Sequence, residues 1–353
     1  MLLDADAIEP LARGCAVLGT GGGGDTAAVE LMVRRAIEVH GPVPVVGRDD
    51  LVDGLVMPCG GIGSPLVSFE KLEGGDEGLR LRDEVERTFG TRVVALMASE
   101  IGGSNGLMPV VWAAQTGLPV LDADGMGRAF PEVQMVTMEL AGVDPSPAVL
   151  TDERGNVAVL RASDGRMLER LERAVCVEMG GVASGADYVM TTAQASTAVI
   201  HGSVSKALRI GRTLADADDP VAALGSELGA VPLIAGSLTD VERRAGDGFA
   251  RGTATIEGLG PDAGRTVRIE IQNENLVARE GAHVLASVPD LITLLDAETI
   301  EAVPTERLRY GQRVMAVGIP CDPVWRTDRG LEVAGPRAFG YDLDFVPVER
   351  ARA

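Results

Sequence analysis

Several features that mark common classes of protein are scarce in this chain of 353 residues. Aromatic residues make up only 3% of it, so its cores must consist of aliphatic side chains and alanine. Lysine occurs only at Lys71 and Lys206, and the formal net charge is -20. So acidic a chain is expected to repel nucleic acid and anionic membrane surfaces, and neither is a predicted partner.

Cysteine is also rare, and the N-terminus has no basic region followed by an apolar stretch. The four cysteines (Cys15, Cys59, Cys176 and Cys321) are far apart and show no CxxC spacing, which excludes a disulfide framework and a zinc ribbon. No segment approaches the roughly 18 apolar residues that a membrane-spanning helix needs. We therefore expect a cytoplasmic protein without a secretory signal.

The common catalytic signatures are missing as well. The sequence contains no HExxH or P-loop motif, which excludes the usual zincin and NTPase interpretations. Any site must be found from the placement of single polar residues.

The first part of the chain alternates helical and strand patterns. Apolar spacing predicts helices over residues 8–18, 25–41, 76–89 and 107–116. Short apolar runs bounded by glycine or proline predict buried strands over 43–46, 54–58, 92–97 and 118–121. This alternation predicts an α/β domain with a mainly parallel sheet over residues 1–165.

The pattern changes in the second part, where we expect a β-rich α+β domain over residues 166–353. Helices are predicted over 164–180 and 203–217, and a strand over 155–164. Between 265 and 279, Val267, Ile269 and Ile271 alternate with polar residues, which predicts one half-exposed antiparallel strand. Short strands with Gly/Pro turns continue from 311 to 348.

Three of the predicted parallel strands end in polar side chains and glycines, at residues 59–65, 98–106 and 122–128. Ligands of open parallel sheets bind at the carboxyl ends of the strands, and glycines let them approach the backbone. We therefore expect these three turns to meet around a site for a small-molecule substrate.

The segment "DADGMGRAFPE" supplies most of the candidate catalytic groups. If its start stays extended, Asp122 and Asp124 lie on one face, about 6 to 7 Å apart. Such a pair requires a proton, a cation or a nearby guanidinium, here that of Arg128, to offset its repulsion. Glu132 is a further candidate acid, although a simple Arg128–Glu132 ion pair is the alternative.

Glu100 follows a run of apolar residues, so we expect it to be half-buried with a raised pKa, as suits a general acid or base. Asn105 is a candidate substrate-binding residue, and the alternative is that it caps the helix that follows.

The glycine-rich segment "GTGGGGD" matches a dinucleotide fingerprint at Gly19, Gly21 and Gly24. That fingerprint must follow a strand, whereas the residues before Gly19 have helical spacing, so NAD is not the favoured cofactor. We interpret the segment as a backbone cradle for substrate, because N–H groups at a helix start bind anions and polarised carbonyls. Its members are Thr20, Gly21, Gly22, Gly23 and Gly24.

Two weaker candidates complete the predicted site. Cys59 lies where a nucleophile could, although buried cysteines are usually inert. His201 could bind substrate, or hold a divalent metal such as zinc together with the aspartates. No metal or other cofactor is required by the sequence.

Nine motifs occur in order over nearly the whole chain: "LGTGGGGD", "GIGSP", "SEIGGSN", "DADGMGRAFPE", "HGSVSKALRIG", "QNENLVA", "PDLI", "RYGQRV" and "GPRAFGYD". Together they resemble the S-methyl thiohydantoin desulfurase-like family, whose genes lie beside those of hydantoinases and oxoprolinases. The resemblance implies two domains and hydrolytic release of methanethiol from an S-methylated thiohydantoin ring. It does not assign catalytic residues.

The candidate residues fit such a hydrolysis, in which Glu100 or Asp122 activates water and Asp124 or Glu132 protonates the ring. Arg128 and the amides of residues 20–24 would stabilise the developing charge. The alternatives are an accessory or ligand-binding subunit of a hydantoinase or oxoprolinase system, a nucleotide-dependent oxidoreductase, and hydrolysis of a ring amide bond. We also expect a homo-oligomer.

Overall fold

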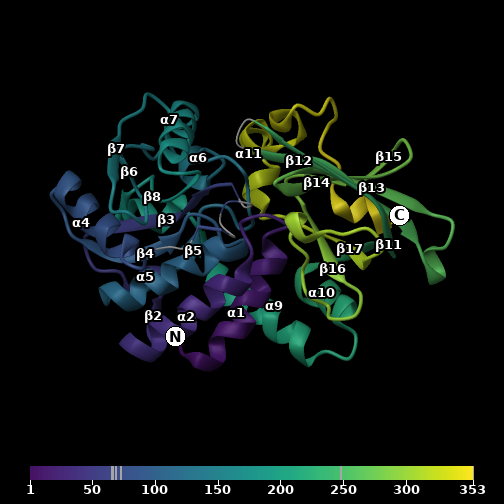
Figure 1. The fold of residues 1–353 in the computed structure, drawn as a ribbon, viewed down its shortest axis with the longest axis horizontal. Coiled ribbons are helices and arrows are strands. Elements are labelled where there is room, and N and C mark those ends of the chain that lie inside the picture. The colour runs from purple at the N-terminus through teal and green to yellow at the C-terminus, as the bar shows by residue number, and fades with distance from the viewer. Residues whose placement is uncertain (65–66, 68–69, 72–73, 247–248, 353) are drawn as a thin grey trace.

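The computed structural model describes residues 1–64, 67, 70–71, 74–246 and 249–352. It contains two β-sheets that lie beside one another, with most of the helices gathered around the first sheet (Figure 1). The early part of the chain forms the first sheet, and the late part forms the second (Figure 1).

The first sheet is mixed, with a parallel centre. Its main path runs β1-β2-β5-β4-β3-β8-β6-β7, and β2, β5, β4 and β3 are mutually parallel. Its strands are β1 (Leu2–Leu3), β2 (Val43–Val46), β3 (Leu55–Gly63), β4 (Val93–Ala98), β5 (Val120–Asp124), β6 (Ala148–Thr151), β7 (Val157–Leu160), β8 (Val182–Ala186), β9 (Met190–Thr191) and β10 (Ile200–His201).

Helices pack against this sheet and against one another: α5 contacts the central strands, α9 contacts β5, and α1 lies between α2 and α9. The helices in chain order are α1 (Ala5–Leu18), α2 (Thr26–His40), α4 (Glu77–Phe89), α5 (Met108–Thr116), α6 (Thr137–Leu140), α7 (Gly165–Glu178), α8 (Thr192–Ala198), α9 (Ser203–Asp216), α10 (Pro220–Leu228) and α11 (Asp328–Ala334).

The second sheet is antiparallel and curls into a half-barrel, in the order β15-β14-β13-β12-β11-β17-β16. The curl brings β14 and β15, at one end of this order, against β16 at the other. Its strands are β11 (Val231–Gly246), β12 (Phe249–Gly258), β13 (Thr266–Gln272), β14 (Glu274–Glu280), β15 (His283–Ser287), β16 (Leu291–Asp296) and β17 (Arg313–Ile319).

The predicted fold classes are therefore confirmed: an α/β part with a largely parallel sheet precedes a β-rich part. The predicted boundary between residues 165 and 166 stays a prediction. Strands β8, β9 and β10 still belong to the first sheet, α9 packs on α1, and the second sheet begins at Val231.

The single strand predicted over 265–279 is wrong, because the chain reverses inside it. Alternation holds through β13, where Val267, Ile269 and Ile271 are buried. Asn273 then adopts a φ of 56°, and β14 runs back along β13 with Gln272 opposite Glu274. An amide side chain tolerates this left-handed conformation better than most. The reversal places Glu274 at a turn.

The cores are aliphatic, as the composition predicts, and the two tryptophans are fully buried. All four cysteines are buried and unpaired. Among the described residues, no helix has the length and apolar character needed to cross a membrane.

The contact of α1 with α9 depends on two glycines. A Cβ atom at Gly14 would lie 1.8 Å from the Ala207 carbonyl oxygen, and one at Gly211 would lie 1.8 Å from that of Pro10. The two backbones therefore touch without side chains between them, which fixes α9 against the N-terminal part of the chain.

We predict that Gly14→Ala destabilises the protein by about 1 to 3 kcal/mol, because overpacking must force the two helices apart. This loss exceeds the gain of about 1 kcal/mol that alanine brings to a helix. Urea unfolding measures the change. The control Gly225→Ala in α10, where a Cβ atom would be 3.4 Å from the Ala230 oxygen, should not destabilise the protein. Equal stability of Gly14→Ala and wild type would contradict the prediction.

Candidate functional site

A cavity of about 300 Å³ lies where the glycine-rich loop meets the ends of several strands. The three segments expected to converge all reach it: residues 60–64 at the end of β3, residues 99, 100, 104 and 105 after β4, and Met126 after β5. The β13–β14 turn and α7 complete the wall. Apolar side chains cover much of the surface, including Val29, Met32, Met108, Met126, Phe130 and Val136.

Glu100, one of the predicted catalytic residues, lines this cavity, and only 7% of its surface is exposed. The Asn105 Nδ2 donates to Glu100 Oε1 over 2.6 Å, and the Phe130 N–H donates to Oε2 over 3.1 Å. Burial raises the pKa of Glu100 to about 8, although these two donors lower it. Glu100 therefore holds a proton for much of the time near neutral pH, and its two donors favour the ionised form.

Asn105 orients Glu100 rather than capping the helix. Its Oδ1 accepts from the Gly61 N–H over 2.7 Å, so β3 fixes the amide that contacts Glu100. Helix α5 begins after Leu107 without a side-chain cap. The helix-cap alternative for Asn105 is therefore wrong.

Glu274 is a second buried carboxyl group on the cavity wall, and sequence reasoning missed it. Only 2% of its surface is exposed, and its Oε2 has no hydrogen-bond partner among the described residues. Burial and the negative charge of Glu100 raise its pKa well above the ordinary value. The polar run "QNEN" between two apolar patterns was the available signal, because it predicts a turn.

The glycine-rich loop joins the two sheets and follows α1, not a strand. The context of a dinucleotide fingerprint is therefore missing. Residues 20, 21, 23 and 24 all have positive φ values. A Cβ atom at Gly22 would lie 2.1 Å from Glu274 Oε1, so the carboxyl group rests directly on the loop.

Parts of this loop face the cavity. Gly23 and Gly24 line it, and their carbonyl groups accept from the backbone of residues 104 and 105. Their N–H groups donate no hydrogen bond within the described part of the chain. Thr20 and Gly21 instead bind the second sheet: Thr20 Oγ1 bonds the backbone of Ile292, and the Gly21 oxygen accepts from Thr305.

Asp122 and Asp124 share one face of β5, as expected, but both point to the start of α9. Asp122 accepts from the Ser205 N–H and hydroxyl, at 3.0 and 2.5 Å. Asp124 is fully buried and accepts from Ser203 Oγ and from the backbone of residues 101, 126 and 127. Burial raises the pKa of Asp124 to about 6. Neither residue lines the cavity, so their geometry supports structural roles.

Arg128 is fully buried, and its described bonds go to groups other than Glu132. Its Nη1 donates to the carbonyl oxygens of Pro289 and Asp290, over 2.6 and 3.0 Å, and its guanidinium lies 4.4 Å from the Phe130 ring centre. Burial lowers the pKa of Arg128 to about 10. Arg128 therefore ties the β5 turn to the second sheet and lies outside the cavity lining.

Of the three remaining candidates, Glu132 lines the cavity, whereas Cys59 and His201 do not. Glu132 lines the cavity and accepts a hydrogen bond from Gln134. Cys59 is buried inside β3, and burial raises the pKa of its thiol, which disfavours a nucleophilic role. His201 is exposed, and its Nε2 lies 3.2 Å from the Ser196 oxygen. Within the described ranges, no group of three or more His, Cys, Asp or Glu side chains is arranged to hold a metal ion.

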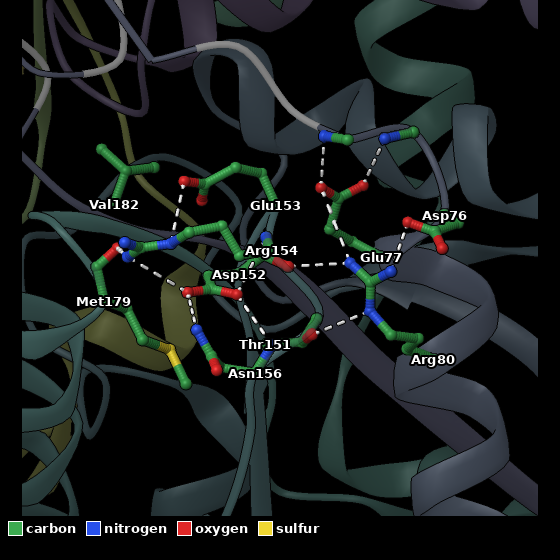
Figure 2. Close-up of polar contacts among 12 residues, drawn as sticks. Asp76, Glu77, Arg80, Thr151, Asp152, Glu153, Arg154, Asn156, Met179 and Val182 are labelled. Carbon is green, nitrogen blue, oxygen red and sulfur yellow. Dashed lines mark hydrogen bonds and ion pairs between the residues drawn. The ribbon is translucent and has the colours of Figure 1, made fainter.

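Ion pairs and hydrogen bonds join the start of α4 and the β6–β7 turn (Figure 2), and further bonds hold Lys71 beside them. The Lys71 Nζ donates to the carbonyl oxygens of Met179 and Val182 and pairs with Glu153. Behind it, Arg80 of α4 binds Thr151 and the Asp152 carbonyl oxygen, as Figure 2 shows. These bonds hold Lys71 and the start of α4 against the β6–β7 turn.

Comparisons with known proteins agree with this architecture. Residues 6–162 match the family described as "S-Me-THD-like, N-terminal domain", and residues 162–348 match "S-Me-THD-like, C-terminal domain". None of the curated proteins compared with the chain matches it.

A crystal structure of a protein from Chromobacterium violaceum superimposes with a TM-score of 0.83. The match covers 99% of this chain and 100% of that chain at 24% sequence identity, a likeness that shows the fold alone. Because the two domain families together span residues 6–348, the chain belongs to the S-Me-THD-like family, the one that its motifs resemble.

Proposed function

We propose that this protein hydrolyses a small S-methylated thiohydantoin-type ring and releases methanethiol. The observation that carries the proposal is that two carboxyl groups line one largely apolar cavity. Glu100 follows β4 of the first sheet, and Glu274 begins β14 of the second. Both have raised pKa values. Two carboxyl groups in unequal surroundings are the usual means of providing a base and an acid at the same pH.

Their surroundings assign the roles. Glu100 receives two hydrogen bonds that favour its ionised form, so it acts as the base that takes a proton from water. Each of its oxygens keeps a second lone pair for this purpose. Glu274 has no partner at Oε2 within the described residues, and the charge of Glu100 favours its protonated form, so it acts as the acid.

The reaction proceeds in two steps. The water oxygen bonds to the ring carbon that carries sulfur, Glu100 takes one water proton, and Glu274 gives its proton to the ring nitrogen. The C–S bond then breaks with its electron pair on sulfur, and the carbonyl forms as the new hydroxyl returns a proton to Glu274. Glu100 passes its proton to methanethiolate, and both carboxyl groups are restored.

The glycine-rich loop would stabilise the charge that develops in the ring. The N–H groups of Gly23 and Gly24 donate to no described residue, and helix α2 begins directly behind them. Preorganised N–H donors of this kind typically contribute 10²- to 10³-fold to a rate. Ring opening at an amide bond would use the same groups with another leaving group. A metal-assisted reaction, an accessory role and a nucleotide-dependent reaction are the competing proposals.

We predict that Glu100→Gln and Glu274→Gln each lower kcat for an S-methyl thiohydantoin by about 10²- to 10⁴-fold, because each variant removes one proton-transfer group. Trapping of released methanethiol with a thiol reagent gives the rate. Glu178→Gln, an exposed change of the same charge at the end of α7, is the matched control and should retain wild-type turnover. Undiminished turnover of either cavity variant would remove that residue from the mechanism.

We also predict that kcat/KM rises as pH increases from 6 to beyond 8, because the base acts only when ionised and burial raises the pKa of Glu100 to about 8. Asn105→Ala removes a donor that favours the ionised form, so the rise should move to higher pH. A profile that is flat over this range, or unchanged in Asn105→Ala, would contradict the role of Glu100.

A further inference from the structure

A second pair of carboxyl groups lies on the cavity wall, away from the glycine-rich loop. Glu172 of α7 and Asp187, which follows β8, both line the cavity. Glu172 is 3% exposed, and its Oε1 is fully buried without a hydrogen-bond partner in the described structure. The Oδ1 of Asp187 is likewise buried without a hydrogen-bond partner among the described residues. Buried polar atoms are normally bonded, so these two require an explanation.

The cationic side chains on the same wall each bond another group, and the charge of Arg173 lowers the pKa of Glu172 by less than burial raises it. Arg173 pairs with Glu169 and donates to the Pro131 oxygen. Lys71 pairs with Glu153 and donates to two carbonyl oxygens. Arg307 pairs with Asp25 at the start of α2. Glu172 and Asp187 therefore both line the cavity, and each has one buried oxygen without a hydrogen-bond partner among the described residues.

We propose that Glu172 and Asp187 form a subsite for a cationic nitrogen group, an ammonium or a guanidinium, on the substituent of the ring. The assignment of that cation to a ring substituent rests on the proposed function, whereas the binding of a cation does not. A cation with several N–H donors would bond both buried oxygens at once and offset their repulsion.

The electrostatics favour a cation over an anion. Burial and the neighbouring Glu169 raise the pKa of Asp187 to about 7. Burial, Asp187 and Glu169 raise the pKa of Glu172 well above its ordinary value. Both shifts mean that negative charge is disfavoured at this place until a positive group arrives. An acidic substituent would add to the repulsion.

The test uses the full chain and two ring-free probes of similar shape, n-butylguanidinium and neutral n-butylurea. Isothermal titration should give a Kd at least tenfold lower for the guanidinium than for the urea. Glu172→Gln and Asp187→Asn should each weaken guanidinium binding about tenfold and leave urea binding unchanged. Glu178→Gln, on the same helix but exposed, is the control of equal charge and should bind as wild type does.

Equal binding of the two probes, or no binding of the guanidinium to wild type, would overturn the subsite. The melting temperature of each unliganded variant shows whether it is folded, and Asp187→Asn, a change at a half-buried residue, provides a second variant if Glu172→Gln does not fold.

Turnover measurements distinguish a failure of this subsite from a failure of the proposed hydrolase activity. S-methyl thiohydantoins with guanidinopropyl and ureidopropyl substituents should differ at least tenfold in kcat/KM, in favour of the guanidinium. Binding of n-butylguanidinium without turnover of either ring would leave the subsite and reject the hydrolase. Equal turnover of both rings without guanidinium binding would reject the subsite and leave the hydrolase.

Discussion

The joint between the two sheets is the contact on which the rest of this site depends. Thr20, with a φ of 49°, donates its hydroxyl to the Ile292 oxygen over 2.9 Å and accepts from the Ile292 N–H over 3.0 Å. Its carbonyl oxygen accepts from the Asn275 N–H over 2.9 Å. One buried residue thus fixes the glycine-rich loop to β14 and β16. Without this register, Glu274 would not rest on Gly22 and face Glu100.

The buried charged residues that connect elements differ from those that line the cavity. Arg128 and Asp124 are fully buried, yet most of their polar atoms are bonded, so they connect elements without facing a ligand. Glu274 and Glu172 on the cavity wall each have an oxygen without a partner among the described residues, and burial raises the pKa of both. Polar groups that are left unbonded inside a protein cost stability, and they are concentrated where binding or chemistry takes place.

Local sequence patterns were enough to predict six of the ten described helices, the parallel strands and the convergence of three strand ends, because these follow from apolar periodicity and glycine placement. They also identified Glu100, a polar residue that ends a buried run. They misdirected attention to Asp122 and Asp124, since spacing along β5 shows that two side chains share a face but not what lies opposite it. Glu274, Glu172 and Asp187 depend on contacts between distant segments, which periodicity does not contain. The 265–279 segment turns back at Asn273, where the backbone adopts a positive φ.

Because Glu100 follows a strand of the first sheet and Glu274 begins a strand of the second, neither half of the molecule alone holds the proposed acid–base pair. A small shift of one half against the other would change the separation of the carboxyl groups while leaving each fold intact. The proposed reaction would then depend on how the two halves are held together as well as on the residues that line the cavity.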